Sequence, residues 1–262
     1  MEECRAASTP LEHGLKLSKE DSAKSPDEKA RMINVPYRQL IGSLMHLALY
    51  TRPDIMHAVT KLSQYNTDPG QLHWNQAKHI LRYLSGTRDY ALSYRAEKAP
   101  AIQIYSDTDW AGDLDDRHSY SGTVVALGQS VIQWRSAKQK SITTSSMEAE
   151  YVALSTGVKE AIWIQMFITE LGMSELLPQT SELRCDNRAA IDFSKNCVEK
   201  GHTKHIDIAH HFVREKLDEK TITLSYIASN ENPADIMTKP LRRVAHQGGV
   251  HKLGLNVAKV GD

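Results

Sequence analysis

Apolar residues recur every three or four positions in three stretches of the first hundred residues. The stretches are YRQLIGSLMHLALY at 37–50, RPDIMHAVTKLSQY at 52–65 and HWNQAKHILRYLSG at 73–86. This spacing places apolar side chains on one face of a helix, and the last stretch ends in a glycine, a common helix stop. The pattern predicts a small helical unit over residues 33–98. Residues 1–32 are polar and charged, which predicts a linker or extended tail.

After residue 99 short β-prone runs alternate with helical periods. The runs AIQIYSD, SGTVVAL and SVIQWRS predict one strand and then a hairpin, because a tight Gly-Gln turn separates the last two. A long helical period spans residues 146–171 and stops at Gly172. The elements predicted after it are a strand SELRCD, helices NRAAIDFSK and HIDIAHHFVREKLDE, a strand TITLSYIAS and a short helix NPADIMTKPL. This succession predicts an α/β domain over 99–241, with a loose tail and one short helix at 242–262.

The overall charge does not point to a polyanionic partner, because lysine and arginine number 32 and so do aspartate and glutamate. Residues 31–95 differ, since they hold eight basic residues and three acidic ones. This excess indicates either a solvated helical surface or a surface that faces phosphates. No apolar run is long enough to cross a membrane, and the first thirty residues lack a signal-peptide core. Three scattered cysteines favour a reducing intracellular setting, with no secretion.

Acidic residues fall at the ends of several predicted elements. Asp107 and Asp186 end strands, Asp235 lies in the first turn of the last helix, and Glu148 and Glu150 lie in the first turns of the long helix. Strand ends and helix starts are where an α/β sheet gathers its ligands. Converging carboxylates need cations, and two Mg²⁺ or Mn²⁺ ions roughly 3.5–4 Å apart make a phosphodiester-cleaving site. The alternative is that each acid is an ordinary cap or turn residue.

The chain resembles the ribonuclease H domain of copia-type retrotransposon Pol polyproteins in a series of long phrases. They are, in order, YSDTDWAGDLDDRHSYSG, SITTSSMEAEYVALS, LRCDNRAAI, TKHIDIAHHFVRE and ENPADIMTKPL. The preceding VPYRQLIGSLMHLALYTRPDIMHAVTKLSQY and HWNQAKHILRYLSGT resemble the segment that follows the reverse transcriptase palm in the same polyproteins. The resemblance covers roughly residues 1–242, and it indicates the C-terminal part of such a polyprotein.

The resemblance implies a ribonuclease H-like fold, a five-stranded mixed sheet with flanking helices, preceded here by the small helical unit. It also implies that the protein cleaves the RNA strand of RNA–DNA hybrids during reverse transcription, with two Mg²⁺ ions that Mn²⁺ can replace. The implied partners are the hybrid and the palm and fingers of the reverse transcriptase in the parent polyprotein. The implied location is cytoplasmic, in a virus-like particle, or nuclear. The polymerase phrase YxDD is missing from these residues, so polymerisation is not expected. A rival interpretation is a catalytically silent relic that binds nucleic acid or a protein.

The family's catalytic, metal-binding carboxylates carry over by motif to four positions: Asp107, Glu150, Asp186 and Asp235. Glu148 is the alternate for the helix position. At roughly 100° per residue the two glutamates point about 200° apart, so one of them faces the site. Ribonuclease H helices commonly carry alanine three residues after the catalytic glutamate, and Ala153 gives Glu150 that spacing. Glu148 is then an exposed acid favoured by the helix dipole.

Several further residues have both a structural and a functional interpretation. Asp109 lies past the expected strand end and is either structural or a helper beside the metal site, whereas Asp113 is expected in a solvated turn. The expected contacts to the nucleic acid are Ser145, Ser146, Asn187, Arg135, Lys138 and Lys140. The serines and Asn187 are also good helix caps. Cellular ribonucleases H use a histidine in the loop before the last helix for proton transfer, but here that loop reads ASNENPAD. The source of that assistance is therefore open.

Overall fold

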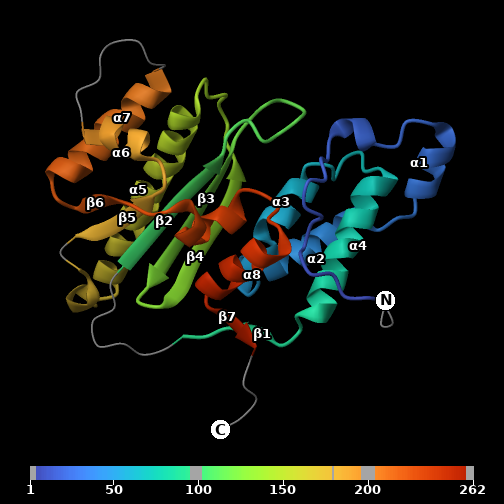
Figure 1. Cartoon of the computed structure of the whole chain (residues 1–262), viewed down its shortest axis with the longest axis horizontal. Helices are drawn as coiled ribbons and strands as arrows, with labels where there is room; N and C mark the ends of the chain where they lie inside the picture. Colours follow the sequence, from blue (N-terminus) through green and yellow to red (C-terminus); the bar gives the residue numbers. More distant parts are fainter. Residues whose placement is uncertain (1–3, 95–101, 179, 196–203, 258–262) are drawn as a thin grey trace, which may run out of the picture. The chain divides into compact units, whose positions relative to one another are not determined.

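A computed structural model describes residues 4–94, 102–178, 180–195 and 204–257 (Figure 1). The chain divides into two compact units. Unit 1 comprises Met1–Ser93, Asp113–Arg117 and Lys239–Asp262, and unit 2 comprises Tyr94–Gly112 and His118–Thr238. The domain boundary predicted at residues 98 and 99 lies outside the described residues.

Unit 2 is built on a five-stranded mixed sheet with the strand order β4-β3-β2-β5-β6 (Figure 1). The strands are β2 (Ile102–Asp109), β3 (Tyr120–Leu127), β4 (Ser130–Lys138), β5 (Ser181–Cys185) and β6 (Ile222–Tyr226). Neighbours among β2, β3 and β4 are antiparallel, whereas β5 runs parallel to both β2 and β6. This arrangement confirms the α/β class that the order of elements predicted and the five-stranded mixed sheet that the resemblance to ribonuclease H domains implied.

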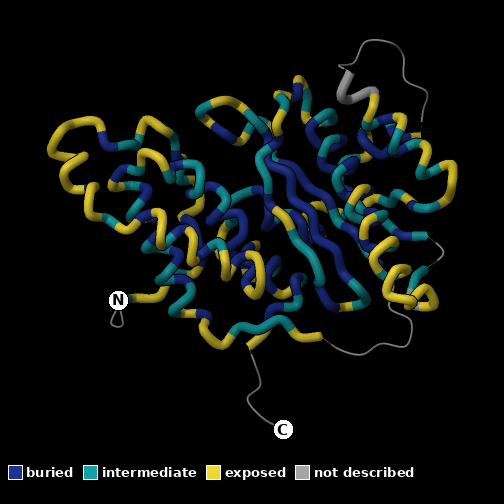
Figure 2. The backbone as a smooth tube through the Cα atoms, turned by 180° about the vertical axis from the view of Figure 1, so that it is seen from behind, coloured by how far each residue is buried: buried dark blue, intermediate teal, exposed yellow. Residues whose placement is uncertain are grey.

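One face of this sheet is covered by helices α5 (Ser146–Glu170), α6 (Arg188–Lys195) and α7 (Lys204–Asp218) (Figure 1). Residues of β3 are almost continuously buried, whereas buried and half-buried residues alternate along β5 (Figure 2). A Cβ added at Gly157 would lie 2.8 Å from Cδ1 of Leu183 and 3.4 Å from Cγ2 of Ile104. Glycine at this helical position therefore allows α5 to lie close to the two central strands, which fixes where the start of α5 stands relative to their ends.

The short 3₁₀ helix η5 (Pro233–Met237) packs against β2 and β3. A Cβ at Gly122 in β3 would lie 2.7 Å from Cβ of Met237 and 2.8 Å from the carbonyl oxygen of Ala234. Only glycine tolerates so close an approach of η5. Asn232 caps the element by accepting a hydrogen bond from the backbone N–H of Ala234. The sequence predicted a short helix here, and a single tight 3₁₀ stretch is what forms.

Unit 1 contains three helices at the positions that the apolar spacing predicted: α2 (Tyr37–Tyr50), α3 (Met56–Ser63) and α4 (Gln71–Gly86). The short 3₁₀ helix η2 (Pro53–Ile55) leads into α3. Ile41, Leu62 and Ile80, one from each helix, are at most 1% exposed. The Tyr37 hydroxyl donates to the carbonyl oxygen of Leu62 at 2.9 Å, so the buried ring also satisfies its polar end.

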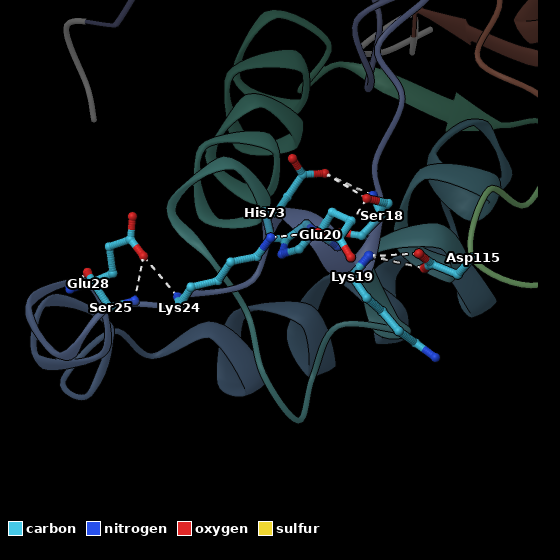
Figure 3. Close-up of polar contacts among 9 residues, drawn as sticks. Ser18, Lys19, Glu20, Lys24, Ser25, Glu28, His73 and Asp115 are labelled. Carbon is cyan, nitrogen blue, oxygen red and sulfur yellow. Dashed lines mark hydrogen bonds and ion pairs between the residues drawn. The ribbon is translucent and has the colours of Figure 1, made fainter.

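The two segments expected as tails hold more structure than the sequence indicated. The first contains η1 (Lys19–Asp21) and α1 (Pro26–Met32), both with serine caps, and a ring nitrogen of His73 lies 3.2 Å from the carbonyl oxygen of Ser18 (Figure 3). The last segment contains α8 (Arg243–Lys252) and β7 (Leu255–Val257), which pairs with β1 (Tyr90–Leu92) (Figure 1). One short helix was expected at 242–262, and α8 lies there. The other elements were missed because short segments give too little periodic signal.

Two buried ion pairs in unit 1 change the interpretation of its basic excess. The Lys61 ammonium lies 2.8 Å from a carboxylate oxygen of Asp113, and the Arg52 guanidinium lies 2.6 Å from Asp54. Asp113 is fully buried, so its expected place in a solvated turn is wrong. The pairing with a largely buried lysine offsets the cost of removing this turn carboxylate from water. Lys61 and Arg52 therefore serve the interior of unit 1 and do not face phosphates.

Among the described residues, no helix is both long and apolar enough to cross a membrane.

Candidate active site

Asp107 lies where the central strand β2 loses one of its two neighbours. The parallel pairing of β2 with β5 ends at Ser106 opposite Cys185, whereas its antiparallel pairing with β3 continues to Asp109 opposite Tyr120. The expectation that the strand ends at Asp107 is therefore wrong by two residues. Asp107 is 2% exposed and is the first residue of β2 beyond the β5 ladder. Asp186 follows β5 directly. Because β2 and β5 are parallel, Asp107 and Asp186 therefore stand at the same edge of the sheet.

A hydroxyl group from the end of η5 orients the Asp107 carboxylate. The Thr238 hydroxyl donates a hydrogen bond to Oδ2 of Asp107 and lies 3.1 Å from the carbonyl oxygen of Asp235. The Asn232 amide donates to the carbonyl oxygen of Ser106 at 2.9 Å. Both bonds join η5, the element that carries Asp235, to the end of β2. The sequence pattern missed Thr238 and Asn232, although both flank Asp235 in the phrase NPADIMT.

Glu150 and Asp186 come together beside Cys185. One potential ligand atom from each of the three residues lies within 4.8 Å of the other two. Glu150 is 8% exposed, and Oδ1 of Asp186 is buried without a hydrogen-bond partner. A buried carboxylate oxygen without a donor is costly, and a cation offsets that cost. The pair of carboxylates therefore has the features of a site for a positively charged ligand.

Cys185 contributes a thiol to this cluster, not a thiolate. Burial, followed by the negative charges of Glu150 and Asp186, raises the pKa of Cys185 to about 12. Its sulfur lies 4.0 Å from Oε2 of Glu150, so the neutral S–H group acts as a weak donor to that carboxylate. The negatively charged ligand atoms of this cluster are then all carboxylate oxygens. Such ligands suit hard cations such as Mg²⁺ and Mn²⁺ rather than soft metals.

The two glutamates at the start of α5 have different surroundings. Oε2 of Glu148 accepts hydrogen bonds from the backbone N–H of Thr144 at 2.8 Å and from its hydroxyl at 2.7 Å. Its own N–H bonds to Oγ of Ser145, the helix cap, at 3.2 Å. Glu148 thus belongs to the capping arrangement, while Glu150 points into the sheet edge. This geometry supports the choice of Glu150 over Glu148, which stays a prediction until activity is measured.

The four predicted carboxylates do not form one tight group. Of the described residues, the group of potential metal ligands within 4.8 Å contains Glu150, Cys185 and Asp186, and neither Asp107 nor Asp235. Asp107 and Asp235 are linked instead through Thr238. The carboxylate of Asp109 closes over the following turn, because a Cβ at Gly112 would lie 1.9 Å from its Oδ2.

Some of the residues expected to contact nucleic acid make contacts within the chain, and others are exposed. Ser145 and Asn187 act as helix caps, accepting from the N–H groups of Glu148 and Ala190. Arg135 lies 3.5 Å from Glu160 and so has an internal partner. Lys138 stands three residues further along β4, hence on the opposite face. Ser146 and Lys140 are exposed.

Gln139 is a further positioning residue that the sequence pattern did not indicate. Its side-chain amide donates to Ser121 of β3 at 2.8 Å and to the carbonyl oxygen of Ala149 in α5 at 2.9 Å. Together these two hydrogen bonds connect the start of α5 to the sheet. Because Ala149 precedes Glu150, this buried amide fixes the height at which Glu150 stands over the sheet edge. A single glutamine after a strand carries no signal of such a role.

Comparisons with known proteins place the chain. No family model matches it. It is 41% identical over 243 residues to the retrovirus-related Pol polyprotein from transposon TNT 1-94 of Nicotiana tabacum, covering 93% of this chain and 18% of the relative. It is 38% identical over 251 residues to the retrovirus-related Pol polyprotein from transposon RE2 of Arabidopsis thaliana, covering 96% of this chain and 17% of the relative. The chain thus spans less than a fifth of the length of these relatives.

Among solved structures, LC11-RNase H1, isolated from compost by a metagenomic approach, matches with a TM-score of 0.39 and 20% identity, over 53% of this chain and 92% of that one. The sequence relationship extends over nearly the whole chain and agrees with the motifs quoted above. The chain therefore belongs to the copia-type family of transposon Pol polyproteins.

Proposed function

We propose that the chain cleaves the RNA strand of RNA–DNA hybrids, with divalent cations held by the carboxylates of unit 2. The observation that carries this proposal is the convergence of Glu150 and Asp186 at the sheet edge where Asp107 stands, with one Asp186 oxygen buried and unpartnered. The strand order of unit 2 and the relationship to Pol polyproteins support it.

The residues present fit hard divalent cations. Glu150 and Asp186 offer close carboxylate oxygens, and the neighbouring thiol stays protonated. Asp107 and Asp235 complete the proposed ligand set from β2 and η5. When bound, a pair of Mg²⁺ or Mn²⁺ ions supplies charge stabilisation at the attacking and leaving oxygens of the phosphodiester.

The chain's own residues position this ligand set. The Thr238 hydroxyl fixes the orientation of the Asp107 carboxylate through its hydrogen bond to Oδ2. Gln139 and the Ser145 cap hold the first turns of α5, so Glu150 enters the site with little freedom. Preorganised ligands cost less entropy on binding. Exposed Ser146 and Lys140 are the residues we assign to the hybrid backbone.

The experiment that tests this function uses the purified full-length chain with an end-labelled RNA–DNA hybrid and Mg²⁺. We expect the RNA strand to be cut, and cutting to fall at least about a thousandfold in Asp107→Asn and Asp186→Asn. The matched control is Asp192→Asn, which removes an exposed acid on α6 of the same unit. Unchanged cutting in the Asp107 and Asp186 variants contradicts the proposed site.

The rival function, a silent relic that binds nucleic acid or a protein, makes a different prediction for the same assay. Folded wild-type chain would then bind the hybrid with and without Mg²⁺ and release no product over many hours. That outcome would replace the proposed nuclease.

A further inference from the structure

Unit 1 contains a cleft of about 950 Å³, and every residue that lines it belongs to that unit. Its walls come from the N-terminal segment 5–13, from the second half of α4, and from α8 together with β7. This volume is at the upper end of the range for small-molecule pockets. The cleft therefore has room for a ligand as large as a few nucleotides.

The charge of the lining is strongly unbalanced. The basic side chains are those of Arg5, Arg82, Arg242 and Arg243. The lining holds one carboxylate, Glu12, and that carboxylate lies 3.5 Å from the ring of His79. Four guanidinium groups around one concavity repel each other, and an anion relieves that repulsion. Guanidinium groups also match phosphate geometry with two parallel N–H donors, which ammonium groups do not.

Hydrogen bonds between distant segments build the cleft. The Arg82 Nε–H donates to the carbonyl oxygen of Arg5 at 2.8 Å, and a ring nitrogen of His79 lies 3.0 Å from the carbonyl oxygen of Thr9. On the other wall, Arg242 Nε–H donates to Nε2 of His13 at 3.1 Å. A Cβ at Gly86 would lie 2.8 Å from that of Ala6, so the N-terminal segment lies tightly against α4. The walls are therefore fixed before any ligand arrives.

The arginines carry the positive charge, because the buried histidines are neutral at physiological pH. Burial lowers the pKa of His79, and burial lowers the pKa of His246 to about 4. Arg5 and Arg243 are exposed, and among the described residues their guanidinium groups make no hydrogen bond or ion pair. Their donors remain available for a ligand.

We propose that this cleft binds the phosphodiester backbone of a single nucleic-acid strand, as a second nucleic-acid site besides the carboxylate cluster of unit 2. The choice of a nucleic acid among polyanions rests on the proposed function, whose substrate has such a backbone. Contacts to phosphate do not depend on base identity, so the cleft binds without sequence preference.

The test measures binding of a fluorescently labelled oligo-dT strand to the full-length chain in EDTA by anisotropy, over a range of salt concentrations. The variant is Arg5→Ala/Arg243→Ala, which removes two charges and breaks no described internal contact. We expect affinity at low salt to fall about tenfold or more. The slope of log affinity against log salt should become shallower by about 1.4, about 0.7 for each lost phosphate contact to a single strand.

The control variant is Lys29→Ala/Arg31→Ala, which removes two exposed charges from α1 of the same unit. It should leave affinity and slope within twofold of wild type. Equal oligo-dT binding by the cleft variant and the wild type, with equal melting temperatures, overturns the proposal. Poly-glutamate serves as a second polyanion. If the cleft variant loses poly-glutamate and oligo-dT binding equally, the nucleic-acid assignment is wrong.

This test is independent of the nuclease assay, because EDTA removes the divalent cations. If the wild-type chain never cuts hybrids, yet the Arg5→Ala/Arg243→Ala variant binds oligo-dT more weakly, the cleft proposal stands and the nuclease proposal fails. If the wild-type chain cuts hybrids and the variant binds oligo-dT as well as wild type does, the nuclease proposal stands and the cleft proposal fails.

Discussion

The hydroxyl of Thr238 donates a hydrogen bond to Oδ2 of Asp107 across 131 residues of sequence. Asp107 is almost fully buried, so its carboxylate depends on donors within the protein, and the Thr238 hydroxyl is one that helps to fix its orientation. Thr238 is therefore a positioning residue for the proposed metal site.

Replacing Thr238 by valine keeps the shape and removes the donor. We expect hybrid cleavage by Thr238→Val to fall about tenfold to a hundredfold, because the carboxylate loses its fixed orientation. The midpoint of Mg²⁺ activation should rise as well, which a purely structural role would not cause. Thr238→Ser restores the hydroxyl and should recover most of the wild-type rate. Equal rates for the valine and serine variants would contradict this role.

Gly122 makes room for η5, so Gly122→Ala should push η5 away from β3. The added Cβ meets atoms at 2.7–2.8 Å, and such overpacking costs about 1–3 kcal/mol of unfolding free energy. Hybrid cleavage should fall too, because Asp235 and Thr238 move with η5. Gly42→Ala is the matched control, since a Cβ there meets nothing within 4 Å in the middle of α2. That control should gain up to about 1 kcal/mol. A stable, active Gly122→Ala chain would argue against the proposed role of η5.

Asp186 and Glu150 carry like charges in close proximity, which predicts opposite effects of Asp186→Asn with and without metal. In EDTA the substitution should raise the melting temperature, because the repulsion between the two carboxylates disappears. In Mg²⁺ the wild type should gain stability through binding, while the variant gains little. Calorimetry of both proteins in both buffers measures this. If Mg²⁺ stabilises the two proteins equally, Asp186 does not hold the ion.

The burial of His246 predicts that unit 1 loses stability in acid. The Tyr83 hydroxyl donates to Asp54, which as a carboxylate only accepts, so His246 Nε2–H donates to the Tyr83 oxygen. Burial lowers the pKa of His246 to about 4 in the folded protein, against about 6.5 when unfolded. The unfolded chain therefore binds more protons between these values. The free energy of unfolding should therefore keep its full value above pH 6.5. It should fall by about 3 kcal/mol as the pH drops to 4.

Thermal unfolding followed from pH 7 to pH 4 measures this loss. His246→Gln keeps an N–H donor and removes the titration, so its unfolding temperature should depend less on pH in this range. An identical pH dependence in the variant and the wild type would show that other groups cause the acid sensitivity.

The sequence predicted the fold well where periodicity was long or motifs were explicit. The helical period at 146–171 corresponds to α5 almost residue for residue, because a 25-residue helix repeats its pattern many times. The order of strands and helices in unit 2 also followed from local patterns. Tertiary partners did not. The pairing of β1 with β7 joins short segments with no periodic signal, and the burial of Asp113 depends on Lys61, 52 residues earlier.

The candidate site shows the same division. Acids at the ends of elements were visible in the sequence. Helix geometry indicated that only one of Glu148 and Glu150 can face the site, and the alanine spacing of the resembled family favoured Glu150. The hydrogen bonds that position them were not visible, because Thr238, Asn232 and Gln139 act through contacts that only the folded chain creates. The orphaned oxygen of Asp186 likewise exists only in the fold.

The most direct test of the central claim compares hybrid cleavage by wild type, Glu150→Gln and Glu148→Gln under single-turnover conditions in Mg²⁺. The two substitutions remove the same charge two residues apart on one helix. We predict that Glu150→Gln loses at least about a thousandfold in rate, while Glu148→Gln stays within about threefold and loses only some stability from its cap. A large loss in Glu148→Gln with normal cleavage by Glu150→Gln would contradict the site described here.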